Sequence, residues 1–148
     1  MKASIAQIVD CYNVLGESKV TKLEESEVIK IVKARKTMRS IAEEFEAFSK
    51  DIEEKLKHDG FEDDEKIRIE LGRKFKENHS YQMTYQEEES MKRMSDYFTK
   101  IFKAKNEEGK REIEIELEPF KLKEDTSIKI LSENGYELKR LDKIDLMF

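Results

Sequence analysis

The chain has 148 residues, a net charge of −5 and 43% charged side chains, a composition that favours one domain built mainly from helices. The acidic balance argues against general nucleic-acid binding, which depends on Lys and Arg displacing counterions from phosphate. With one cysteine, Cys11, the chain can form no intrachain disulfide and no thiolate metal cluster. No stretch of about 18 apolar residues is present, so we expect a cytoplasmic protein without a membrane contact.

Two stretches near the N-terminus have helical periodicity. Residues 3–15 predict a short helix that ends before Gly16 and folds back on a longer one. Residues 24–57 predict a helix about 50 Å long, opened by a capping box at Thr21–Glu24 and closed near Gly60. Its apolar stripe consists of Val28, Ile31, Val32, Met38, Ile41, Phe45, Phe48, Ile52 and Leu56.

The middle of the chain contains an acidic break and a second long helix. Residues 59–65 predict a loop, and apolar alternation on either side of a charged stretch favours a small β-hairpin at 66–85. A capping box at Thr84–Glu87 opens a helix of about 20 residues that ends before Gly109. We expect it to pack antiparallel on the first long helix through Met91, Met94, Phe98, Ile101 and Phe102.

Residues 110–148 change to a period of two. Ile113, Ile115 and Leu117 alternate with glutamates, which predicts a strand with one solvated face, interrupted at Pro119. Ile128 and Ile130 fit another short strand. Residues 133–148 fit two structures: Asn134–Gly135 suits a hairpin turn, whereas Leu138, Leu141, Ile144 and Phe148 have the helical spacing that we favour.

These elements predict an α+β fold that is mainly α. We expect a single domain over 1–148, with an elongated antiparallel helical hairpin in the helical part (1–109) and a small C-terminal β-containing module at 110–148.

The C-terminal pattern resembles a known family. An acidic strand ending in Pro119 and Phe120, a segment led by Ser132, and leucines three apart at Leu138 and Leu141 follow a long amphipathic helical region. This order is similar to a phage-encoded family of small proteins described as a domain of unknown function (number 1617), over roughly residues 25–148. The resemblance implies a phage-associated setting and brings no catalytic residues.

No motif in the sequence predicts catalysis or a cofactor. His58 and His79 flank the middle segment, but a metal site usually takes three or four ligands at fixed spacing. The carboxylates lie on polar faces, and Cys11 lies near an apolar stripe, where a small core residue is expected. We therefore expect no enzyme, no cofactor and no metal.

The most basic stretch supplies the one candidate interaction surface, which consists of Lys30, Lys33, Lys36 and Arg39. Such a run is usually a solvated helix face, and the alternative is a contact with an acidic partner or a phosphate backbone. The apolar stripes resemble those of coiled coils. If they are wider than the rest of the chain can cover, we expect the uncovered part to be the interface of a homodimer or small homo-oligomer. The sequence favours a non-enzymatic protein-interaction or assembly protein, phage-associated. The alternative is an acidic inhibitor or nucleic-acid mimic that acts on a host factor.

Overall fold

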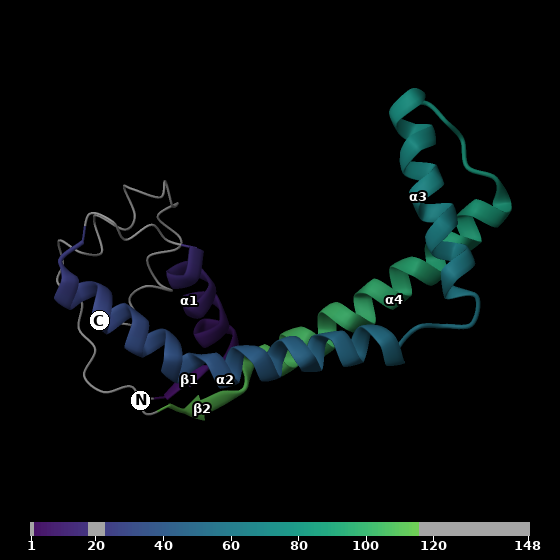
Figure 1. The fold of residues 1–148 in the computed structure, drawn as a ribbon. Coiled ribbons are helices and arrows are strands. Elements are labelled where there is room, and N and C mark those ends of the chain that lie inside the picture. Colours follow the sequence, from purple (N-terminus) through teal and green to yellow (C-terminus); the bar gives the residue numbers. More distant parts are fainter. Residues whose placement is uncertain (1, 18–22, 116–148) are drawn as a thin grey trace. The chain divides into compact units, whose positions relative to one another are not determined.

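The computed structural model describes residues 2–17 and 23–115, which form four helices and a two-stranded sheet (Figure 1). The elements are β1 (Lys2–Ser4), α1 (Ile5–Glu17), α2 (Glu25–Lys55), α3 (Phe61–Glu77), α4 (Tyr85–Lys110) and β2 (Glu112–Glu114). The prediction of a mainly helical fold with a small sheet is confirmed. The predicted antiparallel hairpin of long helices stays a prediction, as does the single domain.

The chain divides into two compact units, which are described separately. Unit 1 contains Met1–Phe48 and Glu107–Phe148, and unit 2 contains Ser49–Asn106.

The sheet of unit 1 pairs β1 with β2 in antiparallel fashion. Ala3 lies opposite Ile113, and the Ile5 amide extends the ladder by donating to the Arg111 carbonyl (3.0 Å). Ala3 and Ile115 are buried while the glutamates of β2 are exposed, so the alternation predicted for this strand is confirmed over the described residues. The partner strand β1 was not predicted, because three residues carry too little periodicity to recognise.

The helix α1 begins with a capping box. The Gln7 amide donates to Ser4 Oγ (3.1 Å), and the Ser4 amide donates to Gln7 Oε1 (3.0 Å), so two amides at the helix start are satisfied. The helix continues to Glu17, and Gly16 therefore lies within it rather than after its end as predicted.

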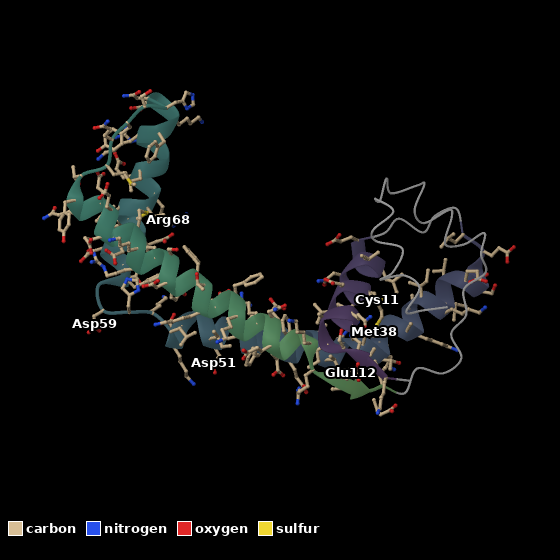
Figure 2. All side chains as sticks on the ribbon, turned by 180° about the vertical axis from the view of Figure 1, so that it is seen from behind. Cys11, Met38, Asp51, Asp59, Arg68 and Glu112 are labelled. Atoms are coloured by element: carbon tan, nitrogen blue, oxygen red, sulfur yellow. The ribbon has the colours of Figure 1, made fainter. Side chains whose placement is uncertain are left out.

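The core of unit 1 lies between α1 and the first half of α2. Its buried residues are Ala3, Ile8, Cys11, Val14, Leu15, Ile31, Ala34, Met38 and Ile115. Cys11 and Met38, labelled in Figure 2, are fully buried, which confirms that the short helix covers this part of the long stripe. Val32 was predicted to belong to the stripe, but 62% of its surface is exposed.

The core of unit 2 forms around the middle of α4. Met94, Tyr97 and Ile101 are buried there, with Ile52 and Phe61 packed against them. The Tyr97 hydroxyl donates to the Glu53 carbonyl (2.6 Å), and Lys105 Nζ lies 2.5 Å from Glu53 Oε1. These contacts attach α4 to the last turns of α2.

The predictions of a loop at 59–65 and of a β-hairpin at 66–85 are wrong. The helix α3 starts at Phe61, and its acidic first turn suits the positive end of the helix dipole. The alternation of Ile67, Ile69 and Leu71 was misread, since Phe61, Asp64, Ile67 and Leu71 also have helical spacing. Residues 78–84 form the link to α4, and Ser80 donates to the Asn78 side chain there (3.0 Å).

Two local features predicted from the sequence lie on either side of α3 and the link that follows it. Gly60 has a left-handed backbone (φ 79°), as expected of this glycine, but it immediately precedes α3 and does not close α2. The Thr84–Glu87 capping box is confirmed, because each residue's amide donates to the other's side chain, at 2.9 and 3.2 Å.

Several predictions lie outside the described residues: the capping box at Thr21–Glu24 and everything after Ile115. Among the residues that the structure describes, no helix is long and apolar enough to cross a membrane.

The core of unit 1 generates a stability prediction. Met38→Ala should lower the free energy of unfolding by about 2–5 kcal/mol, because it leaves a cavity at a fully buried site. Val32→Ala, on the exposed side of the same helix, should change it by no more than about 0.5 kcal/mol. Urea unfolding followed by circular dichroism measures both. If both variants lost the same free energy of unfolding, Met38 would not belong to the core of unit 1.

Candidate protein-binding groove

The predicted basic surface lies on α2 in unit 1. Lys33, Lys36 and Arg39 are exposed, and Lys30 is half-buried with its Nζ 3.5 Å from Glu27 Oε1. The neighbouring Arg35 has a structural part instead: it lies 4.0 Å above the Tyr12 ring and donates to the Tyr12 carbonyl (3.2 Å). The role of Lys30, Lys33, Lys36 and Arg39 as an interaction surface stays a prediction.

A buried polar cluster in unit 2 centres on Asp64, whose side chain is almost fully enclosed. Ser90 Oγ donates to Asp64 Oδ1 (2.6 Å), and Arg93 donates through Nε to Oδ2 (2.8 Å) and through Nη2 to Oδ1 (2.9 Å). His58 Nε2 lies 2.7 Å from Oδ2. We call these four residues the Asp64 cluster. It joins the α2–α3 link, the first turn of α3 and the first half of α4.

The charge of Asp64 is well compensated. The hydrogen bonds from Arg93, Ser90 and His58 hold the pKa of the Asp64 carboxyl well below its usual range, although burial alone would raise it. Asp64 is buried and Arg93 is half-exposed, so the pair positions α3 on α4 at a site that is open to solvent on the side of Arg93.

The Asp64 cluster is not arranged for nucleophilic catalysis. In a serine triad the histidine accepts the serine proton, whereas here both Ser90 and His58 bond the carboxylate. Ser90 is also fully buried, so it cannot reach a substrate. Burial raises the pKa of the Cys11 thiol to about 12, with a smaller effect of Asp10, which makes Cys11 an inert core residue as predicted.

The described part of the chain contains no cluster of metal ligands. No group of three or more His, Cys, Asp or Glu side chains there could hold a metal ion. His58 bonds Asp64, and His79 is exposed in the link between α3 and α4.

A second buried carboxylate, Glu87, fixes the other end of α3. It accepts from the Thr84 amide (2.9 Å), from the Tyr81 hydroxyl (2.8 Å) and from Lys74 Nζ (3.0 Å). These donors, the Thr84 backbone first, lower the pKa of Glu87 from 4.5 to about 2. Two polar clusters thus connect α3 to the first turns of α4.

An apolar groove of about 490 Å³ lies beside this connection. We call it the α4 groove, and it is lined by Arg68, Met91, Met94, Ser95, Phe98, Thr99 and Phe102. Arg68, labelled in Figure 2, lies on α3 with its guanidinium carbon 5.7 Å from the centroid of the Phe98 ring. All other lining residues come from α4, and the exposed fraction is 47% for Phe98 and 72% for Phe102.

The α4 groove exists because α4 carries two apolar stripes. Met94, Tyr97 and Ile101 face the core, while Phe98 and Phe102 are turned about 100° further round the helix and remain exposed. The sequence prediction placed Phe98 and Phe102 in the core, which is wrong. It also missed Tyr97, which is buried and hydrogen-bonded.

A second hollow, of about 500 Å³, lies beside the Asp64 cluster and is polar in character. Asp59, Asp63, Glu89 and Arg93 contribute charged groups to its wall. Polar atoms form about as much of its lining as apolar atoms do, whereas apolar atoms dominate the lining of the α4 groove, which is therefore the better candidate for binding a protein chain.

Comparison of the chain with protein families, with curated proteins and with solved structures finds no match. The resemblance to the phage-encoded family therefore stays a prediction.

The Asp64 cluster generates a second stability prediction. Asp64→Asn keeps the size of the side chain but removes the charge that Arg93 and Ser90 bond, so it should cost about 1.5–3 kcal/mol in the free energy of unfolding of unit 2. Asp63→Asn is the matched control, because the neighbouring carboxylate is exposed and should lose only the contribution of about 0.3–1 kcal/mol that a charge in the first turn gains from the helix dipole. Urea unfolding at neutral pH measures both. If the two variants were equally stable, Asp64 would not hold α3 on α4.

Glu87 generates a prediction about pH. Its folded pKa lies below its unfolded pKa, so the ionised group stabilises the fold above pH 4.5, and this contribution disappears as the pH falls from 4.5 through about 2. Glu87→Gln should therefore lose less stability than the parent over that range, measured by thermal unfolding at a series of pH values. Glu88→Gln, at the exposed neighbouring position, should lose stability with falling pH as the parent does. If the stability of this control also depended less on pH, the acid dependence could not be assigned to Glu87.

Proposed function

We propose that this protein is a non-enzymatic interaction or assembly protein that binds another protein chain in the α4 groove. The observation that carries the proposal is the pair of exposed aromatic rings, Phe98 and Phe102, in one apolar groove along α4. Isolated exposed apolar residues are normal on a protein surface, but clustered aromatic rings usually mark a binding site.

The lining of the groove suits a partner helix. Met91, Ser95, Phe98 and Phe102 follow one another at steps of four, three and four, which places them along one side of α4. A stripe of this kind accepts the apolar face of an amphipathic helix, whose anchors recur at the same spacing. Arg68, whose other contacts are with Glu65, borders the stripe and can bond a polar group of the partner.

The resemblance to the phage-encoded family supports a phage-associated setting, and we expect the protein to act in the cytoplasm. Lys30, Lys33, Lys36 and Arg39 are a second contact surface in this proposal, suited to an acidic partner. The alternative, an acidic inhibitor or nucleic-acid mimic, is supported by the net charge of −5. It predicts that a nucleic-acid-binding enzyme is captured through carboxylates rather than through the α4 groove.

Site-specific photo-crosslinking tests the proposal in cells that produce the protein. A photoreactive phenylalanine analogue at position 102 should form a covalent adduct with a protein, because this ring projects from the groove. The same analogue at position 85 is the matched control, since Tyr85 is equally exposed (75%) on α4 but does not line the groove. Adducts from position 85 and none from position 102 would contradict the proposal.

A further inference from the structure

We infer that the chain that occupies the α4 groove is a second copy of the same protein, docked as an antiparallel pair of α4 helices. The inference rests on the proposed function and deepens it by naming the partner. Two properties of the exposed α4 surface support it: a self-complementary order of side-chain sizes and a self-complementary order of charges.

The order of sizes along the groove fits a two-fold axis. If the axis passes α4 midway between Ser95 and Phe98, Ser95 faces the partner's Phe98, so a small side chain meets a large one. The same axis places Met91 opposite the partner's Phe102. The flexible methionine can then cover the ring that is 72% exposed in a single copy. Each copy contributes both the projecting ring and the space that receives it.

The order of charges selects the antiparallel direction. Residues 85–91 of α4 contain three glutamates and no basic residue, whereas residues 99–105 contain three lysines and no acidic residue. About the axis defined above, residues 88–91 lie opposite the partner's residues 102–105, so an antiparallel pair places Glu88 and Glu89 near Lys103 and Lys105, whereas a parallel pair in register places like charges together. Charge therefore disfavours the parallel arrangement.

One pair of residues at the edge of the stripe is suited to cross the interface. Within unit 2, Glu87 bonds Lys74, Lys105 bonds Glu53, and Glu89 bonds Lys92. Glu88 and Lys103 are both exposed. They lie about four helical turns apart and on the same side of the stripe. Around the axis defined above, Glu88 of one copy comes within about 3 Å, along the helix axis, of the level of the partner's Lys103.

Sedimentation equilibrium of the purified full chain, at low salt and across a range of concentrations, tests the inference. The parent should form a dimer with a Kd in the micromolar range. Phe102→Ser should raise this Kd by at least about tenfold, because it removes the ring at the interface. Tyr85→Ser, an aromatic substitution of equal exposure on the same helix, should leave the Kd unchanged within about twofold. Circular dichroism verifies that each variant keeps its helices.

Charge reversal then tests the direction of the pair. Glu88→Lys and Lys103→Glu should each raise the Kd several-fold, and the double variant should restore it towards the parent value, since the pair is then rebuilt with opposite signs. A double variant as weak as the product of the single variants would overturn the antiparallel register. Two results would contradict the inference that a second copy occupies the α4 groove. One is a parent that sediments at its monomer mass at every concentration, and the other is a Phe102→Ser variant that dimerises as tightly as the parent.

The result also separates this inference from the proposed function. If the parent is monomeric but the analogue at position 102 crosslinks to a different protein in cells, the groove binds another partner and only the self-association is wrong. If the parent is monomeric and no adduct forms at position 102, both proposals fail.

Discussion

The geometry of unit 2 depends on the buried charge of Asp64. A carboxylate that loses its water must be paired and hydrogen-bonded, because an uncompensated charge in a protein interior costs several kcal/mol. Ser90 and Arg93 on α4 and His58 in the preceding link supply those bonds. Sliding or rotating α3 on α4 by one residue breaks this set and leaves Asp64 unsatisfied, so the cluster defines how the two helices meet in a way that apolar contacts alone do not.

The position of the groove follows from the same cluster. Arg68 lies four residues after Asp64, one turn further along the same side of α3. The Asp64 cluster holds this part of α3 against α4, and the guanidinium carbon of Arg68 lies 5.7 Å from the centroid of the Phe98 ring, at the border of the groove. Glu87 holds the link before α4 in a similar way, through Lys74 and Tyr81. Unit 1 is built differently: Cys11, Met38 and their neighbours form an apolar core, where several packings of similar volume are tolerated.

The parts that the sequence predicted correctly are those in which a local pattern has one structural meaning. The stripes of α1 and α2 repeat over several turns, and the Thr84–Glu87 capping box satisfies amides within one turn. The predicted hairpin failed because Ile67, Ile69 and Leu71 are too few to separate a period of two from a helical one. Asp64 was not recognised, since a charged residue in an acidic stretch is normally assigned to solvent. Its burial depends on Arg93, 29 positions away in the chain. Phe98 and Phe102 were assigned to the core because spacing gives a face of the helix but does not tell which face a partner covers.

The width of the apolar sector on α4 carries a consequence for assembly. A helix that packs against one neighbour needs one stripe, and Met94, Tyr97 and Ile101 provide it. Within unit 2, Phe98 contacts the Tyr97 ring and Arg68, yet Phe98 and Phe102 keep much of their surface exposed, so both rings would lose further apolar hydration if a surface outside unit 2 covered them. A stripe that offers both a ring and a recess can be closed by one identical copy. Because a two-fold contact uses the same surface on both copies, the pair then presents no further α4 groove. Association through such a two-fold contact would stop at a dimer rather than grow into an open chain.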